Sequence, residues 1–274
     1  MKLGLQVWTI EQDLIKDMDG ALKAVKEMGY DYVEFGNFYG RTADELASLL
    51  EKHGLTCISV HQPYTAVLEK PEETIAYYKR LGIKYCAIPW MGVESHKGSD
   101  GYEQAVKDIT KVGQLLKKAG IQLLYHNHDF EFQKYEDKFL LDWLLEAVPA
   151  EYLQPQLDTC WIHYAGYNPA EYIKAQTGRI TVIHLKDFVC KRLKGEPVYE
   201  LQGVEAGEEI DSARDDNGFD FRPCGQGRQN FPEILEAAKQ AGVEYAIVEQ
   251  DGCNTAPPLE SVRQSIEYLK PLFV

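Results

Sequence analysis

The sequence has no excess of positive charge. Its 29 Lys and Arg residues are outnumbered by 43 Asp and Glu residues, which gives a formal net charge of −14 at pH 7. A nucleic-acid-binding face needs basic side chains to neutralise phosphates, and anionic membranes attract the same kind of surface. We therefore expect neither a nucleic acid nor a membrane as a partner.

Long apolar runs and paired cysteines are also missing. Met1 and Lys2 lead directly into Leu3–Trp8 without a signal-peptide core, and no run approaches the roughly 20 apolar residues of a membrane-spanning helix. The six cysteines are scattered, and no CxxC motif occurs among them. We expect a cytoplasmic protein with reduced thiols and no zinc finger.

No linker divides the chain, so we expect one domain over residues 1–274. One local pattern recurs: an amphipathic segment ends at a glycine, and a short apolar run follows. A glycine in the left-handed conformation commonly stops a helix. The glycines of this pattern are Gly29, Gly54, Gly82, Gly120, Gly178 and Gly242.

The runs after these glycines, together with Leu3–Trp8 and Leu153–Asp158, make eight strands. The helices between them are predicted at Leu14–Met28, Ala43–His53, Pro71–Leu81, Tyr102–Ala119, Leu140–Ala147, Pro169–Gln176, Phe231–Ala241 and Pro258–Leu269. Eight alternating units predict a (β/α)8 TIM barrel, with an open doubly wound sheet as the alternative. No GxGxxG motif follows the first strand, which disfavours a dinucleotide-binding version of that sheet.

The ends of the predicted strands carry acids, imidazoles and indoles, whereas the starts carry ordinary polar residues. In a β/α barrel the chemistry lies where the strands end. The side chains at those ends are Trp8, Glu34, His61, Trp90, His126 with His128, Asp158, His184 with Lys186 and Asp187, and Glu249 with Asp251. This one-sided polarity predicts an active site at that end of the barrel.

The most concentrated of these ends lies in the stretch 123–132. An apolar strand delivers His126 and His128 on one face, since side chains two apart share a face, and Asp129 and Glu131 follow. Such a stretch packs poorly but suits a metal or a proton-transfer site.

Asp158, His184 and Glu249 each have an ordinary structural interpretation as well. Asp158 could cap a helix, and His184 could be a hydrogen-bonded core histidine. Glu249 ends an apolar strand and needs a partner, because an unpaired buried carboxylate is costly. Taken together, two carboxylates and an imidazole from different strands are best satisfied by a divalent cation.

The remaining polar ends predict a substrate-binding mouth. Tryptophans often stack on the apolar face of a sugar, although a Trp at a barrel mouth can also be rim packing. Lys186 either pairs with Asp187 or holds a substrate hydroxyl. The irregular segment Phe188–Asn230 is predicted to form one side of the mouth. The substrate-binding set is Trp8, Glu34, His61, Trp90, Glu131 and Trp161.

The chain resembles the xylose-isomerase-like TIM barrels, the sugar phosphate isomerase/epimerase superfamily that includes AP endonuclease family 2. The resemblance spans the whole chain, and His126-Asn-His-Asp-Phe-Glu-Phe132 is similar to an HNHxFEF subgroup. The motifs that carry the resemblance are Gly4-Leu-Gln-Val-Trp-Thr9, Tyr32-Val-Glu-Phe-Gly36, His61, Leu157-Asp-Thr-Cys-Trp161, Ala165-Gly166, His184-Leu-Lys-Asp187, Gly225-Gln-Gly227, Val248-Glu-Gln-Asp251 and Pro258-Leu-Glu-Ser-Val262.

The resemblance implies one divalent metal ion, Mn, Mg, Zn or Co, held at four positions. Asp158, His184 and Glu249 match three of them, and His126 stands where relatives have a glutamate; Glu131 is the other candidate for the fourth ligand. The loss of one glutamate puts two-base epimerisation in doubt.

The implied activity is that of a sugar or keto-sugar isomerase or epimerase, which removes a proton next to a carbonyl. A small-molecule sugar is the expected partner, and a homo-oligomer is compatible with these features. The catalytic set is Glu249, His126, His128 and Lys186. A keto-sugar or inosose dehydratase on the same scaffold is the main alternative, because a histidinium at His128 could protonate a leaving hydroxyl. His128 could equally serve only to orient Glu131 or a metal ligand. An endonuclease-like hydrolase and a non-catalytic sugar-binding barrel are weaker alternatives.

Overall fold

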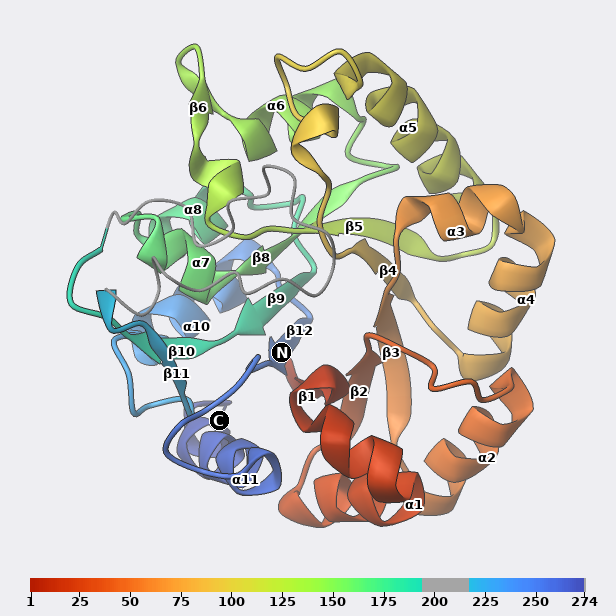
Figure 1. The fold of residues 1–274 in the computed structure, drawn as a ribbon, viewed down its shortest axis with the longest axis vertical. Coiled ribbons are helices and arrows are strands. Elements are labelled where there is room, and N and C mark those ends of the chain that lie inside the picture. The colour runs from red at the N-terminus through yellow and green to blue at the C-terminus, as the bar shows by residue number, and fades with distance from the viewer. Residues whose placement is uncertain (194–216, 274) are drawn as a thin grey trace.

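The computed structural model describes residues 1–193 and 217–273. Eight parallel strands close into a barrel in the order β1-β12-β9-β8-β5-β4-β3-β2, which confirms the predicted (β/α)8 TIM barrel and excludes the open sheet. Helices surround the barrel (Figure 1). The barrel strands are β1 Lys2–Gln6, β2 Tyr32–Phe35, β3 Thr56–His61, β4 Tyr85–Ile88, β5 Gln122–His126, β8 Gln154–Asp158, β9 Val182–Leu185 and β12 Tyr245–Val248.

The helices agree with the sequence pattern, apart from shifts of a few residues at some ends and two short helices, α3 and α7, that it did not predict. The α-helices are α1 Glu11–Met28, α2 Ala43–His53, α3 Tyr64–Glu69, α4 Pro71–Leu81, α5 Tyr102–Lys118, α6 Leu140–Ala147, α7 Thr159–Tyr164, α8 Pro169–Ala175, α10 Phe231–Ala241 and α11 Pro258–Leu269. The 3-10 helices are η1 Val7–Ile10, η2 Val93–Ser95, η3 Phe130–Phe132 and η4 Lys270–Phe273.

Helix α2 shows why these segments form and stop where they do. Thr42 and Glu45 make a capping box that satisfies free backbone N–H groups at its start. Leu46, Ala47 and Leu50 are buried, so one face of the helix packs on the barrel. Gly54 ends the helix with φ of 67°, the left-handed conformation that the sequence pattern requires.

The first strand is shorter than predicted. β1 ends at Gln6, and Val7–Ile10 turns into the 3-10 helix η1 instead of continuing to Trp8. The side chain of Gln6 causes this early ending, because its Oε1 accepts a hydrogen bond from the backbone N–H of Trp8 at 3.1 Å. Trp8 therefore leaves the barrel wall at its C-terminal rim.

The interior of the barrel is layered from apolar to polar. An apolar cluster fills one level: Ile58, Tyr85, Ala87, Leu124, Val182, Tyr245 and Ile247. Two residues further along three of these strands, on the same face, stand His126, His184 and Glu249. The period of the strand thus places the polar set directly above an apolar floor.

Two small two-stranded antiparallel sheets lie outside the barrel. One pairs β6 Lys134–Tyr135 with β7 Lys138–Phe139, and the other pairs β10 Asp187–Val189 with β11 Asp220–Arg222. The second belongs to the segment predicted as one side of the mouth; residues 194–216 of that segment lie outside the described part. Among the described residues, no helix combines the length and apolarity needed to cross a membrane.

Candidate metal centre and active site

A cavity of about 320 Å³ opens where the barrel strands end. Its wall contains indoles, imidazoles, carboxylates and one lysine: Gln6, Trp8, Gly36, His61, Gln62, Pro63, Pro89, Trp90, His126, His128, Lys186, Glu249 and Asp251. A larger groove of about 660 Å³ lies between α1 and α2, but none of the predicted site residues lines it. The chemistry-bearing side chains therefore gather at the barrel mouth.

The four predicted metal ligands converge beside this cavity. His126 ends β5, Asp158 ends β8, His184 lies in β9 and Glu249 follows β12. Each offers one ligand atom, and these atoms all lie within 4.8 Å of one another. All four residues are buried. This convergence of two imidazoles and two carboxylates is compatible with one divalent cation.

Asp158 gives a direct test of whether the set fits a cation. Its Oδ1 caps helix α7 by accepting the backbone N–H of Cys160 at 2.8 Å. Its Oδ2 is buried and accepts no hydrogen bond from the described residues; the Lys186 ammonium lies 3.3 Å away and His126 Nε2 3.7 Å away. A buried carboxylate oxygen that accepts no hydrogen bond is suited to coordinate a metal ion.

The protonation states of His184 and Glu249 show which positive charge a bound metal ion would replace. Burial alone would lower the pKa of His184, but Glu34 and Glu249 outweigh it and raise the pKa to about 10. Burial likewise opposes ionisation of Glu249, yet Lys186 and His184 hold its pKa well below the usual range. The protonated His184 cannot ligate a metal, so binding of a cation displaces this proton.

The other two predicted ligands have pKa shifts that suit ligation near neutral pH. Burial, with smaller contributions from His184 and His61, lowers the pKa of His126 well below its ordinary value, so its imidazole is neutral. Burial raises the pKa of Asp158 to about 6 against the opposing effect of Lys186. A ligand set of two imidazole nitrogens and two carboxylate oxygens suits Zn, Mn or Co better than Mg, because Mg prefers oxygen ligands alone.

Lys186 is the buried cation of the site. Its ammonium lies 2.9 Å from Glu249 Oε2, 2.9 Å from Asp251 Oδ2 and 3.3 Å from Asp158 Oδ2. Burial opposes its charge, but these three carboxylates raise its pKa well above the ordinary value. Lys186 therefore donates hydrogen bonds and does not act as a base. It does not pair with Asp187, the structural alternative raised by the sequence.

Asp187 has a different role that its position after a strand did not reveal. Its carboxylate accepts backbone N–H groups of Phe188, Gly225, Gly227 and Gln229 at 2.9 to 3.1 Å. A side chain at Gly227 would meet Asp187 Oδ1 at 2.2 Å, so only glycine fits there. Asp187 thus holds the Gly225-Gln-Gly227 turn beside β10.

The predicted substrate-binding residues fall into two groups. Trp8, Trp90 and His61 line the cavity, and the two indoles are 42% and 49% exposed. Glu131 and Trp161 are buried away from its wall. Glu131 accepts the Tyr125 hydroxyl at 2.6 Å and the His128 backbone N–H at 2.7 Å; Trp161 stacks on Phe219.

Glu34 lies beneath the cavity and is fully buried. Its carboxylate accepts hydrogen bonds from Gln6 Nε2 at 2.9 Å and Gln156 Nε2 at 2.7 Å, and it faces His61 Nε2 at 3.0 Å and His184 Nε2 at 2.7 Å. These contacts occupy both oxygens, so Glu34 supports the imidazoles of the site. The sequence did not single out Gln6 or Gln156, because a glutamine on a strand carries no signal of its own.

A closed β/α barrel with metal-ligand residue types gathered at the strand ends defines a TIM barrel whose working face is the mouth. The model of the xylose isomerase-like TIM barrel family matches residues 22–272. The chain belongs to that family, as its strand-end motifs predicted.

Individual relatives share its length but only about a quarter of its residues. The chain is 26% identical to the inosose dehydratase of Clostridium botulinum (strain Alaska E43 / Type E3) over an alignment 278 positions long, which covers 90% of this chain and 88% of that protein. It is 24% identical to the inosose dehydratase of Clostridium perfringens (strain 13 / Type A) over an alignment 300 positions long, which covers 98% of this chain and 97% of that protein.

Solved structures confirm the fold. A sugar phosphate isomerase/epimerase from Parabacteroides distasonis ATCC 8503 aligns with a TM-score of 0.76 at 21% identity, covering 98% of this chain and 97% of that one. The IolI protein with a bound zinc atom aligns with a TM-score of 0.72 at 16% identity, covering 99% and 98%.

Proposed function

We propose that this protein is a divalent-metal-dependent dehydratase of a keto-sugar or a keto-cyclitol such as an inosose. The curated relatives named inosose dehydratase support an enzyme that acts on a sugar-like substrate. The observation that carries the choice of reaction is the asymmetry of the cavity wall. Carboxylates line it from the β12 end, Glu249 and Asp251, whereas imidazoles line it from the β3 and β5 ends.

This asymmetry suits elimination better than epimerisation. Epimerisation needs groups that exchange a proton on both faces of one carbon, a task that two carboxylates perform in the isomerases that the sequence resembles. Dehydration needs a base for the proton next to the carbonyl and an acid for the leaving hydroxyl. The isomerase or epimerase interpretation is therefore the second candidate.

The cation held by His126, Asp158, His184 and Glu249 would act as a Lewis acid on the substrate's carbonyl oxygen. Glu249 is ionised and lies at the cavity, so its carboxylate is placed to accept the proton next to the carbonyl. The C–H electron pair then forms the C=C bond as the C–O bond of the neighbouring hydroxyl breaks. His128 is the donor that we assign to this leaving hydroxyl, which departs as water.

Lys186 and the two exposed tryptophans would orient the substrate. The Lys186 ammonium lines the cavity and can donate to a substrate oxygen while it stays anchored on Asp251. Lys186 is the only Lys or Arg among the described residues that line the cavity, and Asp158, Glu249 and Asp251 already hold it. A phosphate group would find no unpaired cation there, so we assign an unphosphorylated substrate.

Product analysis in D2O tests the reaction. The zinc- or manganese-loaded protein is incubated with a panel of keto-sugars and inososes, and products are separated by mass spectrometry and NMR. We expect an unsaturated product that has lost one water. Deuterated epimers or isomers without any dehydrated product would contradict the dehydratase and support the isomerase; no turnover and no deuterium uptake would support a binding protein.

Replacement of Trp90 by Ala should weaken substrate binding. Its half-exposed ring lines the cavity, and one aromatic stacking contact contributes about 0.5–1.5 kcal/mol, so KM should rise roughly 2- to 12-fold. Trp143→Ala is the matched control, because Trp143 lies by the β6–β7 hairpin and donates to Tyr135 O. Equal KM values for the two variants would remove Trp90 from the substrate site.

A further inference from the structure

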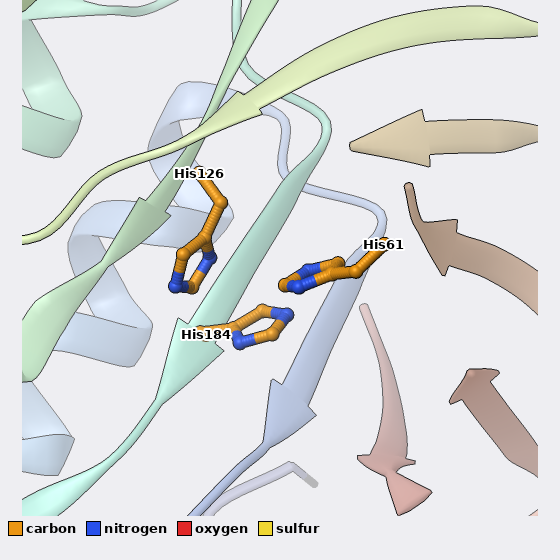
Figure 2. Close-up of side chains that lie close together, drawn as sticks. All are labelled: His61, His126 and His184. Carbon is orange, nitrogen blue, oxygen red and sulfur yellow. The ribbon is translucent and has the colours of Figure 1, made fainter. Parts of the chain in front are cut away.

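Three imidazoles meet at the cavity, and two of them, His61 and His126, line its wall (Figure 2). His61 from β3, His126 from β5 and His184 from β9 have ring centroids 4.7 to 5.2 Å apart, and one ring nitrogen of each lies within 4.8 Å of the others. By residue type alone this group resembles a second metal position that shares two residues with the first. The hydrogen-bond partners of the rings decide whether it can be one.

The side-chain amide of Gln156 has a fixed orientation within this group. Gln156 is fully buried, and its Nε2 donates to Glu34 Oε2 at 2.7 Å. A reversed amide would place two acceptor oxygens against each other. The amide oxygen of Gln156 therefore points to the imidazoles, at 2.7 Å from His61 Nε2 and 3.2 Å from His126 Nδ1.

This oxygen determines which nitrogen of His126 carries the proton. An amide oxygen only accepts, so Nδ1 of His126 must be an N–H donor. The lone pair of the neutral ring is then on Nε2, which is the nitrogen that faces Asp158 Oδ2 at 3.7 Å and Glu249 Oε2 at 4.0 Å. His126 thus presents its free nitrogen to the four-ligand site.

The same argument applies to the other two rings. His61 Nε2 faces Gln156 Oε1 and, at 3.0 Å, Glu34 Oε1, so both neighbours are acceptors and this nitrogen carries a proton. His184 Nε2 faces Glu34 Oε1 at 2.7 Å, which leaves Nδ1, next to Glu249 at 2.8 Å, as its ligand atom. The nitrogens directed at Gln156 and Glu34 are N–H groups and have no lone pair for a metal.

We infer that Gln156 is a positioning residue that fixes the tautomers of His61 and His126 and so confines the site to one metal ion. The part of the inference that concerns the metal ion rests on the proposed function. The histidine tautomers do not depend on it, because they follow from hydrogen bonds within the protein. Partners that orient a metal-ligating histidine contribute about 10- to 100-fold to metal affinity in other proteins.

Nitrogen NMR of the histidine rings tests the tautomers without any mutation of Gln156. Wild-type protein labelled with 15N-histidine is studied as purified and saturated with zinc, and signals are assigned with His61→Asn and His126→Asn. We expect pyrrole-type shifts for His126 Nδ1 and His61 Nε2. A pyridine-type shift at either nitrogen would overturn the inference.

Zinc titration of Gln156→Met tests the consequence for the metal. We expect one zinc per wild-type chain and an affinity about 10- to 100-fold lower in the variant. Gln154→Met is the matched control on the same strand; Gln154 accepts the Thr181 hydroxyl at 3.0 Å, and its change should leave the affinity unaltered. Two zinc ions per chain, or a Gln156→Met affinity within twofold of wild type, would refute the inference.

The two proposals fail in different ways. If the wild-type protein binds no zinc, manganese or cobalt, the proposed function fails, while the ring shifts still decide the role of Gln156. If Gln156→Met does not fold, as judged by circular dichroism, the nitrogen NMR spectra and the zinc stoichiometry of the wild-type protein test the inference.

Discussion

Asp158→Asn should abolish metal retention and lower kcat/KM at least about 1000-fold, which corresponds to roughly 4 kcal/mol of transition-state stabilisation. The asparagine keeps an oxygen that can accept the N–H of Cys160, and Asn is as good a helix N-cap as Asp, so helix α7 should still form. What is lost is the charge of the buried Oδ2, which faces the other ligands. The substitution therefore separates ligation from folding.

Metal content by elemental analysis and steady-state kinetics measure the two effects on the same preparation. Asp44→Asn is the matched control, because it removes the same charge from the surface of α2, where Asp44 pairs with Arg80. The control should retain wild-type metal content and activity. A purified Asp158→Asn protein that still carries one metal ion per chain would remove Asp158 from the ligand set.

Lys186→Met should also lose activity, but unlike Asp158→Asn it should retain the metal. The ammonium competes with a cation for Asp158 and Glu249, so its removal should leave zinc binding at least as tight as in the wild type. We expect kcat/KM to fall about 100- to 1000-fold, the usual cost of removing one donor aimed at developing charge.

The stability of the same variant should depend strongly on the metal. Without a cation, three carboxylates lose their buried partner, and breaking such an ion pair costs about 3–5 kcal/mol. Added zinc should therefore raise the Tm of Lys186→Met more than that of the wild type. Lys84→Met at the opposite end of the barrel, where Lys84 contacts the Tyr245 hydroxyl, should change neither activity nor the response to zinc. Loss of metal from Lys186→Met, or an unchanged kcat/KM, would contradict the assigned role.

The barrel was predictable because its signals are local. Helices such as α4 and α10 are bounded by a proline at the start and a left-handed glycine at the end, and both match their predicted limits. The convergence of Asp158, His184 and Glu249 followed from one rule, that strand ends of a β/α barrel meet at one face. Neither inference needs knowledge of contacts between distant residues.

The supporting contacts could not be predicted in this way. Gln156 and His61 are 95 residues apart, and their hydrogen bond depends on the register of two strands, β8 and β3, that are not neighbours in the barrel. Trp161 belongs to a motif at the mouth, but α7 begins directly after β8 and carries its ring into a cluster with Phe219 and Phe221. Glu131 is turned inward by the 3-10 helix η3 to meet Tyr125.

The central claim is that one divalent cation lies among His126, Asp158, His184 and Glu249. Anomalous diffraction from crystals grown with zinc, collected on both sides of the zinc edge, tests it most directly. We predict one peak per chain, bonded to one atom from each of these four residues, with Lys186 held by Asp251. A peak centred on His61, His126 and His184, or the absence of any peak at the barrel mouth, would contradict this account.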